Sequence, residues 1–192
     1  MPKKHIAIFV SGNGSNCENI IKHFSNNTDV EISLVVSNKP DAFALVRAQR
    51  LGIETCTLNK QQFNDEAELM TLLKKHDIDF IVLAGFLLMI PPFLVEAFNR
   101  RMINIHPALL PKYGGKGMYG HHVHEAVWAA KEKETGFTVH WVSNVCDGGD
   151  IIMQHRVALT DSDTPDTIAE KEHELEMKYF PTDIENILNG FS

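Results

Sequence analysis

The chain has 192 residues, of which 44% are hydrophobic and 22% are charged, and its formal net charge is −7. This length allows one domain with a real core, and the longest apolar run, residues 80–90, is too short for a transmembrane helix. The acidic balance argues against a general nucleic-acid surface, and the chain starts directly with a predicted strand instead of a signal peptide, so we expect small-molecule substrates and a cytoplasmic location.

The first half of the chain alternates predicted strands with predicted helices. The strands are expected at residues 5–10, 30–37, 53–57, 80–84 and 102–106, and the helices at residues 16–24, 41–50, 63–76 and 91–98. Ser15 and Glu18 fit a capping box, with Ser15 as the N-cap of the first helix. The alternation predicts a mostly parallel sheet with right-handed crossover connections.

The second half departs from this alternation. Residues 109–120 contain one proline and four glycines, which predicts a mobile loop without helix or strand. A helix at residues 121–133, two strands at 137–143 and 151–157 that are expected to be antiparallel, and a last helix that starts at Thr164 follow. The whole chain is therefore expected to be an α/β protein with about seven strands in a mostly parallel twisted sheet and helices on both faces.

The end of the predicted strand at residues 102–106 carries two polar side chains. Asn104 and His106 share one face, because side chains alternate along a strand, and Pro107 ends the strand there. In open α/β sheets, ligands bind outside the carboxyl ends of the strands. An amide and an imidazole at this edge are therefore candidates for chemistry, although a hydrogen-bonded amide and a satisfied edge histidine stay open as the alternative.

The first strand is followed by a glycine-containing loop, residues 11–16, which leads into a helix. Glycines let backbone N–H groups approach an anion, and the N-terminus of the helix adds positive potential. The loop has neither the lysine of a Walker A motif nor the three-glycine spacing of a dinucleotide site, so its pattern favours a single phosphate. A tight turn without a ligand is the alternative.

A carboxylate follows the predicted strand that bears His140. Asp147 opens an Asp-Gly-Gly turn, where an aspartate often only braces its own backbone. Beside a histidine, however, a carboxylate favours the protonated imidazole and makes it a usable general acid near neutral pH. An amide, an imidazole and a carboxylate together suit carbonyl chemistry, because they can stabilise an oxyanion and deliver a proton.

The other side chains that could bind a metal ion do not show the spacing of a metal site. His121, His122 and His124 would spread around a helix axis, and no cysteine or acidic residue stands at metal-site spacing from them. The three cysteines, Cys17, Cys56 and Cys146, are odd in number and lack Cys-x-x-Cys spacing, so a disulfide framework is not expected and they are interpreted as packing residues. No metal cofactor is expected.

Four motifs in chain order resemble the phosphoribosylglycinamide formyltransferase family. They are Ser-Gly-Asn-Gly-Ser-Asn at 11–16, Leu-Ala-Gly-Phe at 83–86, Asn-Ile-His-Pro-Ala-Leu-Leu-Pro-Lys-Tyr at 104–113 and Asp-Gly-Gly at 147–149. The resemblance implies a single domain, residues 1–192, with a Rossmann-like phosphate-binding half (about 1–103) and a half with folate and catalytic elements (about 104–192). It also implies that the formyl group of 10-formyltetrahydrofolate is transferred to the amine of glycinamide ribonucleotide in purine synthesis.

The resemblance also assigns roles to residues by position. Asn104, His106 and Asp147 correspond to the catalytic triplet, with His106 as general acid and Asp147 raising its pKa. The substrate-binding residues implied are Gly14, Ser15 and Asn16 for the phosphate, and His173 and Glu176 for the glycinamide ribose. The residues implied to bind folate are Leu87, Leu88, Met89, Ile90, Asn104, Ser143, Asn144, Val145, Cys146 and Asp147. The chain is expected to be a monomer or a homodimer.

The chain departs from the family pattern at several positions. Some members carry arginines near the positions of Glu66 and Leu88, which leaves contacts to the folate glutamate tail unassigned. Family members usually have an acidic residue at the position of Asn144 and an aliphatic one at that of Cys146, and the glycines of residues 114–117 lengthen a loop that can act as a lid.

Four other functions share part of this pattern. A methionyl-tRNA formyltransferase and a formyl-folate hydrolase would share the triplet, but each needs an additional domain for which 192 residues leave no room. A nicotinamide-dependent oxidoreductase is disfavoured by the incomplete glycine spacing. A catalytically silent nucleotide-binding module stays open.

Overall fold

The computed structural model describes residues 3–190 and divides the chain into two compact units, one ending at Asn104 and one beginning at Ile105. The first unit contains the strands β1 (Lys4–Val10), β2 (Val30–Ser37), β3 (Thr55–Thr57) and β4 (Phe80–Leu83) and most of β5 (Met102–His106). Its helices are α1 (Ser15–Phe24), α2 (Phe43–Arg50), α3 (Lys60–Phe63), α4 (Glu66–Lys75) and α5 (Pro92–Ala97).

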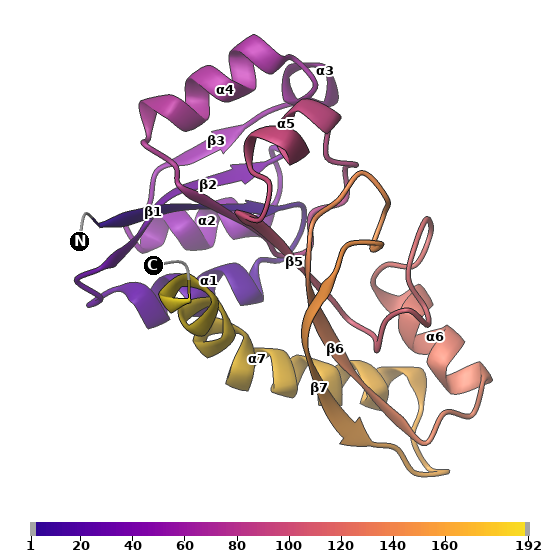
Figure 1. The fold of residues 1–192 in the computed structure, drawn as a ribbon. Coiled ribbons are helices and arrows are strands. Elements are labelled where there is room, and N and C mark those ends of the chain that lie inside the picture. Colours follow the sequence, from indigo (N-terminus) through magenta and orange to yellow (C-terminus); the bar gives the residue numbers. More distant parts are fainter. Residues whose placement is uncertain (1–2, 191–192) are drawn as a thin grey trace. The chain divides into compact units, whose positions relative to one another are not determined.

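The strands of the first unit run parallel in the order β3-β2-β1-β4-β5. Residues Ile6 to Phe9 of β1 are fully buried, as expected where helices cover both faces of a parallel sheet. Helices α1 and α2 lie on one side of these strands, and α4 and α5 lie on the other (Figure 1). The chain adds β2 and β3 on one side of β1 and then β4 on the other, which creates a switch point between β1 and β4.

Helix boundaries in the first unit correct two predictions. The helix expected at residues 63–76 is α4, which begins only at Glu66 because the Asp65 side chain caps it, and Phe63 ends the separate helix α3, which Asn59 caps. The capping box at Ser15 is also wrong. The N-cap of α1 is Gly14 in the left-handed conformation, without a side-chain cap, and Glu18 instead pairs with Lys22 and Arg47.

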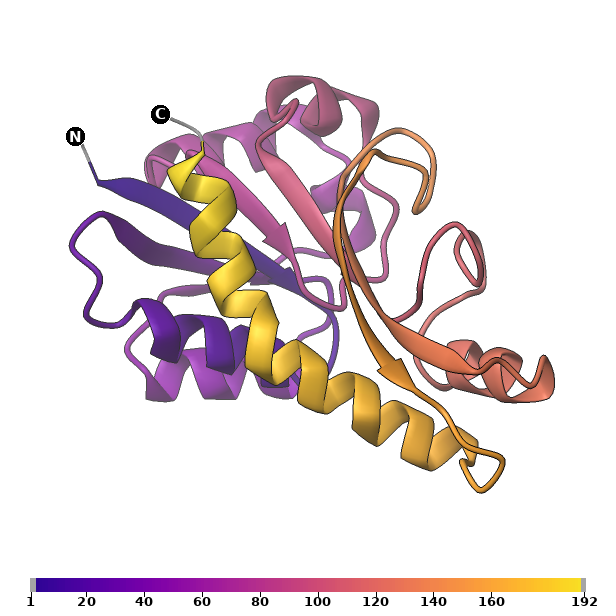
Figure 2. The same cartoon turned by 60° about the horizontal axis from the view of Figure 1, so that its bottom comes forward.

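The second unit contains an antiparallel pair of strands and two helices among its described residues. They are α6 (His121–Ala129), β6 (Glu134–Trp141), β7 (Ile151–Ala158) and α7 (Pro165–Asn189). Helix α7 lies along β6 and β7, with α6 near its N-terminal end (Figure 2). The small core between these elements consists of Ala108, Val123, Val127, Leu159 and Ile168. The last helix continues through Pro181 to Asn189.

Two histidine–carboxylate contacts tie α7 to its neighbours in the second unit. His155 of β7 stacks on Tyr179 and contacts the Asp183 carboxylate at 2.9 Å. His124 of α6 contacts the buried Glu172 carboxylate at 2.9 Å. Burial raises the pKa of Glu172 and, likewise, of Asp183, although the histidines oppose this shift. These contacts fix the helix that carries two of the predicted substrate-binding residues.

The structure confirms the expected α/β fold. All seven strands belong to one sheet, four of its strand pairs are parallel, and the β6–β7 pair is antiparallel as predicted. Strands β2 and β5 have the predicted bounds to the residue. No helix within residues 3–190 is long and apolar enough to cross a lipid bilayer.

Candidate active site

The glycine loop lies at the switch point of the first unit, after the carboxyl end of β1. The Ser11 N–H donates to the carbonyl oxygen of Gly85 at 2.9 Å, and the Leu87 N–H donates to the Ser11 hydroxyl oxygen at 2.9 Å. These bonds join the loop to the segment that follows β4. Two of the stretches predicted from sequence to bind ligands therefore meet at the edge where such sheets bind them.

Gly14 fits its position only because it lacks a side chain. Its φ is 79°, and a Cβ atom there would lie 2.3 Å from the Cβ of Ala44, so both the backbone conformation and the packing against α2 favour glycine. The helix begins directly after it, with Ser15 as its first residue and Asn16 as its second. The positive end of the α1 dipole and the first-turn N–H groups are thus at the loop.

The segment after β4 presents apolar side chains to solvent. Leu87 is 49% and Met89 57% exposed, Leu88 is half-buried, and Ile90 is buried. Exposed apolar side chains of this kind suit a flat heterocycle, whereas the Ile90 side chain is buried. Asn104 is half-buried on β5 and pairs in register with Leu83, the last residue of β4.

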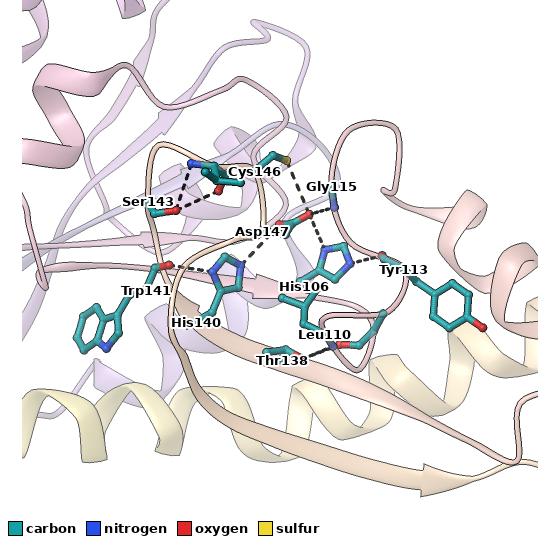
Figure 3. A network of polar contacts seen from close by, with 12 residues as sticks. His106, Leu110, Tyr113, Gly115, Thr138, His140, Trp141, Ser143, Cys146 and Asp147 are labelled. Atoms are coloured by element: carbon teal, nitrogen blue, oxygen red, sulfur yellow. Dashed lines mark hydrogen bonds and ion pairs between the residues drawn. The ribbon is translucent and has the colours of Figure 1, made fainter.

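In the second unit, His106 and Asp147 come together. His106 ends β5 and is 4% exposed, and its Nδ1 lies 3.5 Å from Oδ2 of Asp147 (Figure 3). Its Nε2 lies 2.7 Å from the carbonyl oxygen of Tyr113. Because a carbonyl oxygen can only accept, Nε2 carries a hydrogen, and a proton on Nδ1 would then be shared with the carboxylate. The resemblance implied this pair, whose members lie 41 positions apart in the sequence.

Asp147 is held in place from three sides. Oδ2 accepts a hydrogen bond from the Gly115 N–H at 2.9 Å, and Oδ1 lies 3.6 Å from Nε2 of His140. The residue adopts φ of 52°, in the left-handed region that aspartate and asparagine tolerate better than most residues. The carboxylate therefore faces two buried imidazoles and one backbone donor.

His140 was not among the residues predicted for the site. It is 2% exposed on β6, and its Nδ1 lies 2.9 Å from the carbonyl oxygen of Trp141, which fixes the hydrogen on that nitrogen (Figure 3). One signal was present in the sequence, because His140 follows Thr138 on one face of a strand that leads to the Asp-Gly-Gly turn. The sequence did not show that the turn folds back far enough to bring Asp147 close to the His140 side chain.

The pKa of His106 differs from the prediction in its net direction. Burial lowers the pKa of His106 below its ordinary value, and the Asp147 carboxylate and the Tyr113 carbonyl oppose this shift without cancelling it. Burial alone would raise the pKa of Asp147, but the His140 hydrogen bond, the His106 charge and the Gly115 N–H together hold the pKa below its ordinary value. Asp147 is therefore a carboxylate at neutral pH, and His106 releases a proton readily.

The lowered pKa of His106 predicts a pH dependence of stability. The unfolded chain binds a proton at this histidine near pH 6.5, whereas the folded chain binds it only at lower pH, so this contribution to stability is complete above about pH 6.5 and is lost as the pH falls through the folded pKa. The melting temperature of the wild type should therefore drop relative to that of a His106→Asn variant between about pH 7 and pH 5. Parallel melting curves across this range would contradict the assignment.

The loop between β5 and α6 forms neither helix nor strand, as predicted. Tyr113 has a φ of 56°, and its side-chain hydroxyl donates to Glu132 at 2.8 Å while the ring packs against the core of the unit. This loop contacts both members of the pair. The Tyr113 carbonyl oxygen accepts from His106, and the Gly115 N–H donates to Asp147.

The remaining predicted residues lie on two other elements of the second unit. In the turn before Asp147, Ser143 is half-buried and hydrogen-bonded to Val145, and Asn144, Val145 and Cys146 are exposed. On α7, Nδ1 of His173 lies 4.0 Å from a carboxylate oxygen of Glu176, so the two side chains are neighbours one helical turn apart.

Two interpretations of potential metal-ligating residues can be checked. Cys17 is a buried packing residue as expected, but Cys146 is exposed, because it lies in the turn and not on a strand. The three histidines of α6 do not share one acidic neighbour: His121 and His122 both approach Glu125, whereas His124 approaches Glu172.

Comparisons with known proteins connect this geometry to a family. The model of the formyl transferase family matches residues 4–184. A phosphoribosylglycinamide formyltransferase of Bacillus subtilis is 34% identical over 190 residues, covering 96% of this chain and 95% of the relative. A chloroplastic phosphoribosylglycinamide formyltransferase of Arabidopsis thaliana is 39% identical over 90% of this chain, and a trifunctional purine biosynthetic protein of Drosophila melanogaster is 35% identical over 98% of it.

The relatives differ in length. The chain spans 63% of the Arabidopsis protein and 14% of the Drosophila protein. Among solved structures, the phosphoribosylglycinamide formyltransferase of Bacillus halodurans superimposes with a TM-score of 0.88 at 34% identity, covering 98% of this chain and 97% of the other. That of Coxiella burnetii gives a TM-score of 0.84 at 38% identity, over 94% of this chain and 84% of the other.

Proposed function

The chain belongs to the formyl transferase family, and from this premise we propose that it transfers the formyl group of 10-formyltetrahydrofolate to the amine of 5-phosphoribosylglycinamide. The products are 5-phosphoribosyl-N-formylglycinamide and tetrahydrofolate, and the reaction belongs to de novo purine synthesis. The observation that carries the proposal is the buried pair of His106 and Asp147 at the end of β5, in a chain whose relatives bear this activity in their names.

The proposed chemistry needs an oxyanion donor and a proton carrier. The substrate amine attacks the formyl carbon, a carbon–nitrogen bond forms, and negative charge develops on the formyl oxygen, where the Asn104 amide and the His106 imidazole donate hydrogen bonds. His106 in its protonated form delivers the Nε2 proton to N10 of the folate as the bond from the formyl carbon to N10 breaks, and Nε2 then accepts the proton that the amine loses. Asp147 orients the imidazole and stabilises its charged form.

The lowered pKa of His106 is consistent with this sequence of proton transfers. Because burial lowers the pKa of His106, the protonated imidazole gives up its proton readily to the leaving nitrogen. The proposed reaction uses side-chain and backbone hydrogen-bond donors and needs no metal ion. The partners that we propose are the two small-molecule substrates, for a monomer or homodimer in the cytoplasm.

The substrates are assigned to different segments of the chain. We assign the ribose phosphate to the loop of Gly14, Ser15 and Asn16 and to His173 and Glu176 of α7. Folate is assigned to the apolar segment after β4 and to residues 143–147. The support for the first assignment is the helix N-terminus at the loop, and the support for the second is the exposed apolar surface of Leu87 and Met89.

Changing Ser15 to aspartate should weaken phosphate binding without unfolding the helix. An acidic residue in the first turn of a helix is favourable for folding, typically by about 0.3–1 kcal/mol, yet its charge repels a bound phosphate. We expect KM for the ribose phosphate to rise at least about tenfold with little change in KM for the folate. Steady-state kinetics with each substrate varied in turn measures this, and an unchanged KM for the ribose phosphate would remove the loop from the site.

The direct experiment is to mix the pure protein with 10-formyltetrahydrofolate and glycinamide ribonucleotide and to follow the folate absorbance. The expected result is formation of tetrahydrofolate that depends on the glycinamide substrate. Release of formate at the same rate without that substrate would indicate a hydrolase instead. A thermal-shift series with folate, ribose phosphates and NAD adds a second readout, and stabilisation by NAD alone would contradict the proposal.

A further inference from the structure

We infer that Arg47 is a positioning residue for the glycine loop: its guanidinium holds the Asn13 peptide in the orientation in which the loop can bind a phosphate. This inference rests on the proposed function and extends it to a residue of α2 that lies outside the motifs. The evidence comes from contacts within the first unit and from the geometry of the peptide bond.

Arg47 makes several directed contacts with the loop and its helix. Nε donates to the carbonyl oxygen of Asn13 at 3.0 Å, and Nη2 donates to Oδ1 of the same residue at 2.7 Å. Nη1 donates to a carboxylate oxygen of Glu18 on α1. The guanidinium carbon lies 4.9 Å from the centre of the Phe43 ring, so the planar fork of guanidinium N–H donors is also stacked on an aromatic face. A planar group held in this way has little freedom to turn.

Two successive carbonyl groups of the loop face α2. The Gly12 carbonyl accepts from the Ala44 N–H at 3.1 Å, and the Asn13 carbonyl accepts from Arg47. In a planar trans peptide the C=O and the following N–H point in opposite directions. The N–H groups of Asn13 and Gly14 are therefore turned away from α2. Successive N–H groups turned to one side form a nest that suits an anion.

A rotated peptide would present the wrong group. If the unit between Asn13 and Gly14 turned over, its carbonyl oxygen would occupy the side of the nest and would repel a phosphate. Gly14, with its φ of 79°, has the backbone freedom to allow such a rotation, because glycine accepts positive and negative φ about equally. The fork of Arg47 is thus the contact that selects one of two accessible orientations.

Arg47 also balances the charge of Glu18, and the two effects can be separated. A carboxylate without this partner near the loop would repel a phosphate irrespective of peptide orientation. Arg47→Lys keeps the positive charge but cannot reproduce the fork on Asn13, whereas Arg47→Gln removes both charge and fork. Arg50 provides a matched control, because it lies on the same helix and its guanidinium stands 5.8 Å from the same ring of Phe43.

The test measures kcat and KM for Arg47→Lys, Arg47→Gln and Arg50→Gln with the ribose phosphate varied. We expect KM for the ribose phosphate to rise at least about tenfold in both Arg47 variants, with kcat and the KM for folate within about twofold of wild type. Arg50→Gln should match the wild type. Melting temperatures establish that the variants are folded. If Arg47 only stabilised the fold, its variants would lower kcat and would change KM for both substrates, not KM for the ribose phosphate alone.

Three outcomes would overturn the inference. Full recovery of KM in Arg47→Lys would show that charge, and not the fork, is what matters. Unchanged KM in both Arg47 variants, while Ser15→Asp still raises KM, would reject the role of Arg47 but leave the phosphate site in place. Unchanged KM in Ser15→Asp as well would reject the phosphate assignment of the loop itself, so failure of this inference is distinguishable from failure of the proposed function.

Discussion

Replacing His106 with alanine is expected to lower kcat at least about a hundredfold, because general acid–base catalysis typically contributes about 10²–10⁴-fold. The imidazole is buried at the end of β5, with one nitrogen facing Asp147 and the other facing the Tyr113 carbonyl. Its loss removes both a donor to the oxyanion and the carrier of the proton. The measurement is the initial rate at saturating concentrations of both substrates.

Two comparisons separate chemistry from damage to the fold. His106→Gln fills part of the cavity and keeps a hydrogen-bond donor, but it cannot carry a proton, so its kcat should be nearly as low as that of the alanine variant. His23→Ala removes an exposed histidine from α1 and should leave kcat unchanged. Turnover of His106→Ala near the wild-type level would reject His106 as the proton carrier.

The second large effect is expected from Asp147→Asn, which should also lower kcat at least about a hundredfold. Asparagine tolerates the left-handed backbone conformation of this residue, and its side-chain oxygen can still accept from the Gly115 N–H. The substitution therefore preserves the turn and removes chiefly the negative charge that faces His106 and His140. KM for each substrate should change far less than kcat.

Asp150→Asn provides the matched control for this substitution. Asp150 lies three residues later, after the same turn, and is exposed, so the same change of charge there should leave kcat near the wild-type value. Because Asp147 acts through His106, the double variant His106→Ala/Asp147→Asn should be no slower than His106→Ala alone. Multiplicative losses in the double variant, or normal turnover in Asp147→Asn, would contradict a shared role.

Sequence reasoning located most strands because their signals are local. Strand β2 is an apolar stretch bounded by polar residues, and β5 ends at a proline, so both ends could be predicted. The start of α4 was predicted three residues too early because Asp65 lies inside an otherwise periodic stretch, where a cap cannot be told from a surface residue. At Ser15 the motif was present, but the packing of Gly14 against Ala44 set the actual helix start.

The candidate site was predictable only where a motif carries it. Asn104 shares a strand face with His106 at the end of β5, and Asp147 opens a turn, which is why their pattern pointed to chemistry. The contacts of His140 and Arg47 depend on how distant segments pack, and no spacing in the sequence encodes them. The predicted net direction of the His106 pKa shift was wrong for the same reason, because the sequence indicated a neighbouring charge but not the degree of burial.

The hydrogen on Nε2 of His106 already has an acceptor within its own chain, the peptide oxygen of Tyr113 at 2.7 Å. A substrate atom can take that hydrogen only by displacing this oxygen. In the proposed reaction, an uncharged formyl oxygen is no better a partner than a backbone carbonyl, so the exchange gains little in the ground state, whereas an oxygen that bears negative charge accepts roughly twice as strongly. Competition from the Tyr113 carbonyl thus makes the hydrogen bond to the substrate stronger in the transition state than in the ground state. Only such a difference in binding accelerates a chemical step.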